Sequence, residues 1–282
     1  MDHLYQLPGL GAPEEPMLEA YTTLGALATA TEKVQLGTLV TGNTYRNPPT
    51  LLAKAITTLD VISQAAPSWA SGPAGSSWNT TASATSSVRS PSGSRSSTRR
   101  SRSSCRCSKA TASHSTAPIT RLRKPSRIPR FRDHIPLMIG GSGEKKTIPL
   151  AARHFDHLNI IAGFDELPRK VAVVKENCEK IDRDPATLET SVLAIALIGE
   201  QYTADIIPDE FKQQAVYGAP EQVAEQLKEK VYDAGVDGVI LSAFTIGGYT
   251  PPGGVAAVGE ALRPLIAGVN RPKGAGAKRP GG

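Results

Sequence analysis

The feature that most constrains the fold is a long central stretch without acidic residues. From Val61 to Arg132 the sequence has 13 Lys or Arg and no Asp or Glu, and residues 86–109 read SSVRSPSGSRSSTRRSRSSCRCSK. The formal net charge of +6 therefore hides 19 basic against 26 acidic residues in the remainder. A densely charged segment with few large apolar side chains cannot bury enough surface to offset the entropy of ordering its backbone. We expect residues 66–127 to be disordered between two globular portions at 1–65 and 128–268, followed by a flexible tail at 269–282.

Outside this segment, short apolar runs alternate with stretches of helical period. The expected strands are residues 34–41, 136–139, 157–161, 190–197 and 239–242, and the expected helices are residues 16–30, 48–62, 144–154, 166–181, 220–234 and 254–266. Buried strands that alternate with amphipathic helices indicate parallel β/α units. The sequence therefore predicts an α/β fold, best matched by an eight-stranded (β/α)8 TIM barrel, with a doubly wound sheet as the alternative.

Composition excludes several other classes. No apolar run approaches the roughly 20 residues that span a bilayer, and MDHLYQLPGLG lacks the basic start and apolar core of a signal peptide. We therefore expect a cytoplasmic protein with no membrane partner. The three cysteines, Cys105, Cys107 and Cys178, form neither a disulfide framework nor the spacing of a zinc site. No metal site is expected.

A glycine cluster is the first candidate site. In LMIGGSGEKKT, residues 137–147, a buried strand runs into Gly140, Gly141, Ser142 and Gly143, and a helix follows at once. Free backbone N–H groups at a helix N-terminus suit a phosphate, and glycines let an anion approach the backbone. The alternative is a tight turn whose glycines only satisfy backbone geometry, because a short glycine cluster is a weak signal.

Two further candidates lie near the start of the chain. A His beside a carboxylate, as in Asp2 and His3, can act as a general acid or base whose protonation the neighbour tunes. The pair is also compatible with a mobile N-terminus. The third candidate is GTLVTGNTYRNPP, residues 37–49, where a strand ends in Gly, Asn, Tyr and Arg at the place where a barrel carries its ligand loops. A plain polar loop is the alternative there.

Four segments carry a resemblance to a known family that covers about three quarters of the chain: DHLYQLPG, LEAYTTLGALATATEKVQLGTLVTGNTYRNPPTLLAKAITTLDVIS, IPLMIGGSGEKKTIPLAARHFDHLNI and YGAPEQVAEQLKEKVYDAGVDGVILS. In order and spacing they resemble the luciferase-like monooxygenase superfamily, and within it the actinobacterial oxidoreductases that use the deazaflavin coenzyme F-420. The resemblance implies a β/α barrel with the cofactor at the C-terminal ends of its strands.

The resemblance also implies site residues. The Asp-His pair of the family falls on Asp2 and His3, beside the reactive ring. The strand that backs the ring, often with a non-proline cis peptide, falls on residues 39–41, and the phosphate loop falls on residues 140–143 and on two residues after the following strand. The implied cofactor-binding residues are Leu39, Val40, Thr41, Gly140, Gly141, Ser142, Gly143, Ala162 and Gly163.

Two features depart from the family pattern. Family members have a first strand and helix ahead of the Asp-His pair, whereas this chain starts at that pair, so we expect an incomplete barrel without its first strand. The second departure is that residues 66–127 stand where the family has its fourth strand and the next helix.

The replaced segment has a simple interpretation in the genetic code. Read one base earlier, residues 67–88 admit AELGIGAGWFELEHDSLGYEFG, which resembles the missing strand and its cofactor loop. The single Trp codon forces Gly at Trp69-Ala70 and Glu at Trp78-Asn79, where the family pattern has them. We therefore interpret the segment as coding sequence read out of frame, with the proper frame resuming near residues 128–131.

These observations predict an oxidoreductase that passes a hydride between coenzyme F-420 and a small organic substrate, with this chain impaired by its replaced segment. In that interpretation His3, oriented by Asp2, handles the substrate proton. An FMN-dependent monooxygenase of the same superfamily is the alternative. A nucleic-acid-binding arm formed by the basic Ser/Arg segment is an alternative of another class, which we do not favour because the segment interrupts a β/α repeat. A solvated linker between two binding domains is a third. The substrate stays open, and a homodimer is compatible with the sequence.

Overall fold

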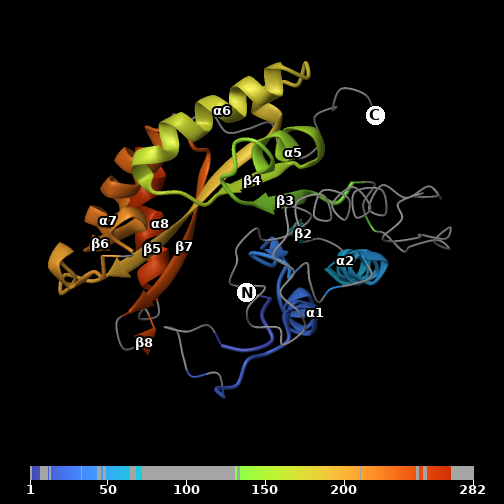
Figure 1. Ribbon diagram of the computed structural model, residues 1–282. Coiled ribbons are helices and arrows are strands. Elements are labelled where there is room, and N and C mark those ends of the chain that lie inside the picture. The colour runs from blue at the N-terminus through green and yellow to red at the C-terminus, as the bar shows by residue number, and fades with distance from the viewer. Residues whose placement is uncertain are drawn as a thin grey trace. The chain divides into compact units, whose positions relative to one another are not determined.

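A computed structural model of the chain describes residues 2–6, 12, 14–32, 34–42, 46, 49–63, 68–71, 131, 134–209, 211–245, 248–249 and 253–267. The chain divides into two compact units, Met1–Gly140 and Gly141–Gly282, which are described separately (Figure 1). Most of the Ser/Arg segment and all of the expected tail at 269–282 lie outside the described residues. The expected disorder of those residues therefore stays a prediction.

The first unit contains two helices and three short strands. In chain order they are α1 (Ala20–Ala30), β1 (Leu36–Gly37), α2 (Pro49–Ser63), β2 (Ser68–Ser71) and β3 (Leu137–Gly140). β1 pairs in parallel with β2, through Leu36 opposite Ser68, and β2 pairs in parallel with β3, through Ala70 opposite Leu137. This pairing confirms the predicted parallel arrangement in the unit.

The helices of the first unit form where apolar residues recur at helical spacing. The Glu19 carboxylate caps α1 by accepting hydrogen bonds from the backbone N–H groups of Tyr21 and Thr22. One face of α1 then packs into a small core with β1 and α2, made of Leu24, Ala28, Leu36 and Leu59, with Tyr21 against it. α1 begins four residues later than predicted, because this cap fixes its start.

The segment expected to be disordered holds one strand. β2, with the sequence SWAS, lies inside residues 66–127 and takes the place between β1 and β3. The prediction of disorder was wrong at these four residues. Strand pairing is supplied by backbone groups, which do not depend on the apolar pattern that the prediction used.

The second unit continues the alternation of helices and strands. Its elements are α5 (Thr147–His154), β4 (His157–Ile160), α6 (Leu167–Glu179), β5 (Glu189–Ile198), β6 (Ala215–Gly218), α7 (Pro220–Leu227), β7 (Gly238–Thr245), β8 (Gly248–Tyr249) and α8 (Gly254–Leu265). The predicted helix at 220–234 is α7 followed by a π-helical turn, Lys228–Tyr232. β6 and β8 were missed, because four and two residues are too few to show a period.

The long strand β5 organises this unit. Its first half pairs with β4, from His157 opposite Glu189, and its last four residues pair with β6, from Ile195 opposite Ala215. β7 runs along the other edge of β5, and all three pairings are parallel. Every residue of β4 and most of β5 are buried, as in a parallel sheet covered by helices.

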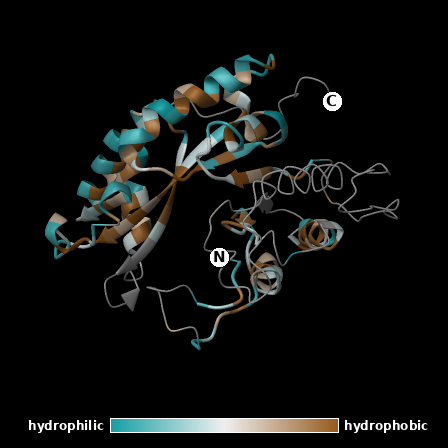
Figure 2. Ribbon diagram, viewed as in Figure 1, coloured by the Kyte–Doolittle hydropathy of each residue, from teal (hydrophilic) through white to brown (hydrophobic). Residues whose placement is uncertain are grey.

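The helices show the complementary pattern. Figure 2 shows hydrophilic and hydrophobic residues interleaved along α6, as expected of a helix with one face against a core. Its buried residues, Leu167, Val171, Val174 and Cys178, recur at spacings of three and four. Together with the parallel pairings, this confirms the predicted α/β fold. Among the described residues, no helix is both long and apolar enough to cross a membrane.

Candidate functional site

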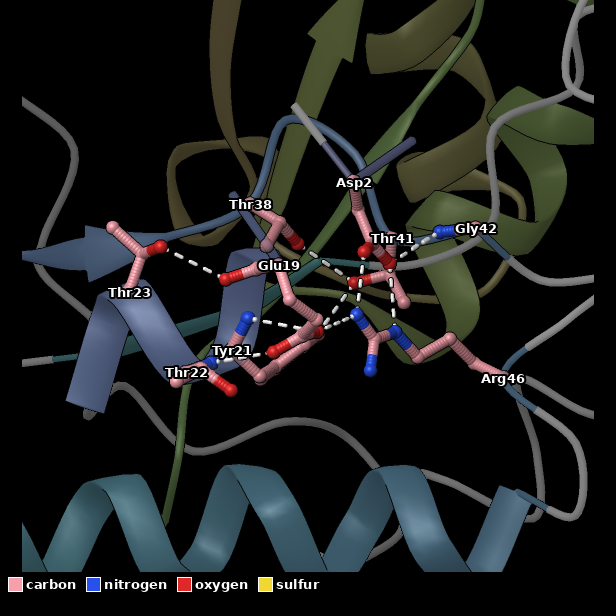
Figure 3. Close-up of polar contacts among 9 residues, drawn as sticks. All are labelled: Asp2, Glu19, Tyr21, Thr22, Thr23, Thr38, Thr41, Gly42 and Arg46. Carbon is pink, nitrogen blue, oxygen red and sulfur yellow. Dashed lines mark hydrogen bonds and ion pairs between the residues drawn. The ribbon is translucent and has the colours of Figure 1, made fainter. Parts of the chain in front are cut away.

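The Asp2 carboxylate is buried, with 2% of the residue exposed. Its Oδ2 accepts hydrogen bonds from the Gly42 backbone N–H and from Arg46 Nε, each 2.9 Å long, and its Oδ1 accepts one of 2.6 Å from Arg46 Nη2 (Figure 3). The sequence predicted that Asp2 would orient His3. The structure gives the Asp2 carboxylate Arg46 and Gly42 as partners instead, because a guanidinium offers two parallel donors to a carboxylate.

Arg46 joins this carboxylate to the start of α1. Its Nη2 also donates to Glu19, and its guanidinium carbon lies 4.5 Å from the centroid of the Tyr21 ring. The hydrogen bonds that Arg46 donates to Asp2 raise the pKa of Arg46, so the guanidinium stays charged. Although partial burial acts in the opposite direction, hydrogen bonds from Arg46 and Thr22 lower the pKa of Glu19 to about 2. Arg46 is therefore a cation held between two carboxylates and an aromatic ring.

A chain of hydroxyl groups lies on the other side of Tyr21. The Tyr21 hydroxyl is 2.7 Å from Thr41 Oγ1, which is 2.7 Å from Thr38 Oγ1 (Figure 3). Both threonines are buried. Burial raises the pKa of the Tyr21 phenol, so it stays neutral and can donate to Thr41. The side-chain hydrogen bond between Thr38 and Thr41 links the residues on either side of Leu39 and Val40.

The Leu39–Val40 peptide is cis. This is the position at which the resemblance placed a non-proline cis peptide. Thr41 is 1% exposed, and Val40 is partly exposed beside it. The three residues implied to back a ring thus follow β1 after Thr38 and precede Gly42, whose N–H donates to Asp2.

His3 lies next to the buried carboxylate and is itself only partly buried. Burial lowers the pKa of its imidazole below the usual 6.5, and the charge of Asp2 opposes the shift without cancelling it. The imidazole is therefore mainly neutral at pH 7, which is the form that can accept a proton.

The glycine-rich loop belongs mostly to the second unit. Gly141 has a φ of +143°, and a Cβ there would lie 2.9 Å from Thr147 Cγ2, while a Cβ on Gly143 would lie 3.0 Å from Thr147 Oγ1. Contact with the first residue of α5 therefore accounts for two glycines without any ligand. The loop still fits an anion, because the N-cap residue Lys146 makes no side-chain cap and the first turn of α5 has no acidic residue.

The loop also carries one carboxylate. Glu144 accepts hydrogen bonds from Lys170 Nζ, at 2.9 Å, and from Arg169 Nη2, at 3.0 Å, both on α6. These bonds lower the pKa of Glu144, and its hydrogen bond raises the pKa of Lys170. The charge of the carboxylate is thus balanced by two cations.

Ala162 and Gly163 follow β4, as the sequence predicted. Ala162 is buried, and a Cβ on Gly163 would lie 2.6 Å from Asp165 Oδ1 and 3.2 Å from Gln213 Cβ. Gly163 therefore allows the close approach of two neighbouring segments. Like the other implied site residues, both keep their proposed role in cofactor binding as a prediction.

Sequence reasoning missed a polar cluster between β4 and β5. His157 Nε2 lies 2.6 Å from Ser191 Oγ, which also accepts a 2.9 Å hydrogen bond from Asn159 Nδ2. Burial lowers the pKa of His157 to about 4. The signal for this cluster in the sequence is that His157 and Asn159 are two residues apart, since alternate residues of a strand share one face. Among the described residues, no group of three or more His, Cys, Asp or Glu side chains is placed to hold a metal ion.

Comparison with known proteins identifies solved structures of the same fold. No protein-family model matches the sequence, and no curated protein does either. An F-420-dependent secondary alcohol dehydrogenase in complex with an F-420–acetone adduct is similar at a TM-score of 0.74 and 16% identity, over 95% of this chain and 88% of that chain. The coenzyme F-420-dependent tetrahydromethanopterin reductase of Methanopyrus kandleri is similar at a TM-score of 0.66 and 14% identity, over 89% of this chain and 86% of that one.

A flavin enzyme shares the fold as well. The oxygenating constituent of 3,6-diketocamphane monooxygenase from Pseudomonas putida, in complex with FMN, is similar at a TM-score of 0.60 and 15% identity, over 98% of this chain and 88% of that chain. At these identities the likeness establishes the fold. The α/β fold that the sequence predicted is therefore confirmed.

Proposed function

We propose that this chain is built as a luciferase-like oxidoreductase that transfers a hydride between coenzyme F-420 and a small organic substrate. The observation that carries the proposal is the likeness to the F-420-dependent alcohol dehydrogenase along 95% of this chain. The deazaflavin, when bound, supplies a ring carbon that accepts or returns a hydride. The residues of this chain would bind and orient the cofactor and the substrate, and His3 would move a proton.

His3 is the proposed proton acceptor. When a substrate alcohol is oxidised, its C–H bond breaks and the hydride leaves for the ring, while the hydroxyl proton must pass to a base. A neutral imidazole can take that proton, and the lowered pKa of His3 keeps the imidazole neutral at pH 7. In the reverse direction the imidazolium returns the proton to the carbonyl oxygen.

Residues 39–41 are proposed to support one face of the ring. The hydrogen bond between Thr38 and Thr41 holds this segment closed, and the bond from Gly42 N–H to Asp2 ties it to the residue before His3. The two contacts fix the proton acceptor and the proposed ring support in one arrangement, which matters because hydride transfer is sensitive to displacements of about 1 Å.

Residues 140–143, with Ala162 and Gly163, are proposed to hold the cofactor phosphate. The first turn of α5 holds no acidic residue, and the cations on α6 balance the Glu144 carboxylate that would otherwise repel an anion.

An FMN-dependent monooxygenase is the second candidate. The likeness to the FMN complex of 3,6-diketocamphane monooxygenase favours it, because that enzyme shares the same fold. A phosphate loop serves both cofactors, so the loop does not separate the two candidates.

The test is equilibrium binding of four ligands to the full chain: coenzyme F-420, its phosphate-free deazaflavin chromophore, FMN and riboflavin. Binding of F-420 at least tenfold tighter than FMN supports the first proposal, and the reverse order supports the second. A tenfold loss without the phosphate supports the role of the loop. Because the replaced segment is expected to impair this chain, the same titration is run on a version with the reading frame of residues 66–127 restored. Failure of both versions to bind any of the four contradicts the proposed function.

A further inference from the structure

We infer that Arg46 is a positioning residue for the proposed reaction: its guanidinium takes up the Asp2 carboxylate and holds the segment that carries His3 against α1 and the loop after β1. This inference rests on the proposed function, and all the contacts that support it lie within the first unit. We call Asp2, Glu19, Tyr21, Gly42 and Arg46 the Arg46 clamp.

The contact between Arg46 and Asp2 is a bidentate hydrogen bond between two charged groups. Two donors of one planar guanidinium meet the two oxygens of one carboxylate, at 2.9 and 2.6 Å, and Asp2 is 2% exposed. Hydrogen bonds between charged groups are shorter and stronger than neutral ones, and the bidentate form also fixes direction. Removal of one partner leaves a buried charge without compensation, which is costly.

The clamp joins three parts of the chain that are distant in sequence. Asp2 precedes His3, Glu19 caps α1, and Gly42 follows the proposed ring support at residues 39–41. Arg46 contacts the first two directly, and Asp2 binds the third through the Gly42 N–H. The position of His3 relative to residues 39–41 therefore depends on a residue that need not touch substrate or cofactor.

The clamp also sets the charge that His3 experiences. Burial disfavours protonation of the His3 imidazole, and the charge of Asp2 favours it. Arg46 lies directly on the Asp2 carboxylate and offsets its negative charge. Without Arg46, the uncompensated carboxylate would favour the imidazolium, which cannot accept a proton.

The experiment is an NMR titration of the His3 imidazole in the full chain, which requires neither cofactor nor turnover. Arg46→Gln is expected to raise the pKa of His3 by about 0.5 unit or more, Asp2→Asn to lower it, and the double variant to return it near the parent value. Arg46→Lys keeps the positive charge and loses the two parallel donors of the guanidinium. It should therefore leave the pKa of His3 near the parent value while lowering the thermal midpoint of unfolding. Lys228→Gln, which removes an exposed lysine paired with Asp233 in the second unit, is the matched control.

The pattern of signs decides the inference. A purely structural role for Arg46 would lower the thermal midpoint and leave the pKa of His3 unchanged in Arg46→Gln, and that result would overturn it. Shifts of the same sign in Asp2→Asn and Arg46→Gln would overturn it as well. If Arg46→Gln fails to fold, the difference in the pKa of His3 between Asp2→Asn and the double variant still gives the test, because neither leaves an unpaired buried carboxylate. An equal pKa in those two variants would overturn the inference. Failure of cofactor binding with the expected sign pattern would contradict the proposed function and leave the clamp standing.

Discussion

Lys170 Nζ donates a hydrogen bond of 2.9 Å to Glu144 Oε1, and this pair joins α6 to the glycine-rich loop before α5. Only 11% of the Lys170 side chain is exposed. A carboxylate in a proposed phosphate loop is unfavourable unless a cation compensates it. Lys170 and Arg169 provide that compensation, which links the sequence of α6 to the chemistry of the loop.

The first prediction tests this compensation. Lys170→Gln should weaken binding of FMN or coenzyme F-420 by about threefold to tenfold, because Glu144 then repels the phosphate. The double variant Glu144→Gln with Lys170→Gln should recover the affinity. Fluorescence titration of each ligand measures the effect, and Lys175→Gln, an exposed lysine on the same helix, is the control. Equal losses in the single and the double variant would show that Lys170 acts on the phosphate directly.

The second prediction concerns the hydroxyl chain behind residues 39 and 40. Tyr21→Phe removes the 2.7 Å contact with Thr41 and leaves a buried hydroxyl with one partner fewer. The free energy of unfolding should fall by about 1 kcal/mol, the usual worth of a buried neutral hydrogen bond. Urea unfolding followed by circular dichroism measures it. Tyr5→Phe changes an exposed tyrosine in the same way and should have no effect. A neutral result for Tyr21→Phe would mean that the contact does not stabilise the unit.

The third prediction follows from the lowered pKa of His157, which is about 4 because the side chain is buried. Between about pH 6.5 and pH 4 the unfolded chain binds a proton at this residue that the folded chain does not. Stability contributed by neutral His157 is therefore present above pH 6.5 and lost as the pH falls towards 4, by at most about 3 kcal/mol. His157→Gln should flatten the pH dependence of the unfolding free energy in this range.

His134→Gln serves as the control for that measurement, since it removes another histidine of the described chain. Urea denaturation at pH 7, 6, 5 and 4 gives the slopes. If His157→Gln leaves the slope unchanged, protonation of His157 does not limit stability in acid, and the burial argument fails at this residue.

The sequence was a good guide to the repeating part of the fold. The helices α2 and α8 and the strands β3, β4 and β5 begin and end within two residues of their predicted bounds, because helical periods and short apolar runs between helices carry their own signal. β2 and β6 were missed because their pairing is decided by neighbouring strands. Parallel pairing needs a partner that a local window does not contain.

The candidate site was only partly predictable. The sequence suggested Asp2, His3 and residues 39–41, and the structure brings Asp2 to Gly42 beside them. The choice of Arg46 over His3 as the partner of Asp2 could not be predicted, since it depends on a contact across 44 positions. Arg46 lies in residues 37–49, which the sequence indicated as a candidate ligand loop. The local sequence does not show in which direction its guanidinium points.

The fourth prediction concerns the replaced segment at the level of DNA. Relative to closely related coding sequences, a one-base change is expected near codons 63–66 and a compensating one near codons 125–130. Sequencing of both regions tests it. If related genes encode the same Ser/Arg run in frame, the frame interpretation fails and a basic nucleic-acid arm gains support. Such an arm should bind RNA with a steep dependence on salt.

The last prediction is that this chain has little or no catalytic activity until that segment is restored. β2 contacts its neighbours over a short length: two residue pairs with β1, Leu36–Ser68 and Gly37–Trp69, and two with β3, Ala70–Leu137 and Ser71–Met138. So short a ladder offers few backbone hydrogen bonds to hold the strand that lies between β1 and β3. Residues 39–41 follow β1 after Thr38, so fluctuation of β2 would move the proposed ring support relative to His3, and a displacement of about 1 Å costs on the order of a hundredfold in rate. A version with the frame restored and a first strand and helix added ahead of Asp2 should therefore bind coenzyme F-420 or FMN at micromolar concentration and turn over, whereas the chain as given should do neither within a hundredfold of that rate. Turnover by the unrestored chain at a comparable rate would show that four residues of β2 are enough to keep the site aligned.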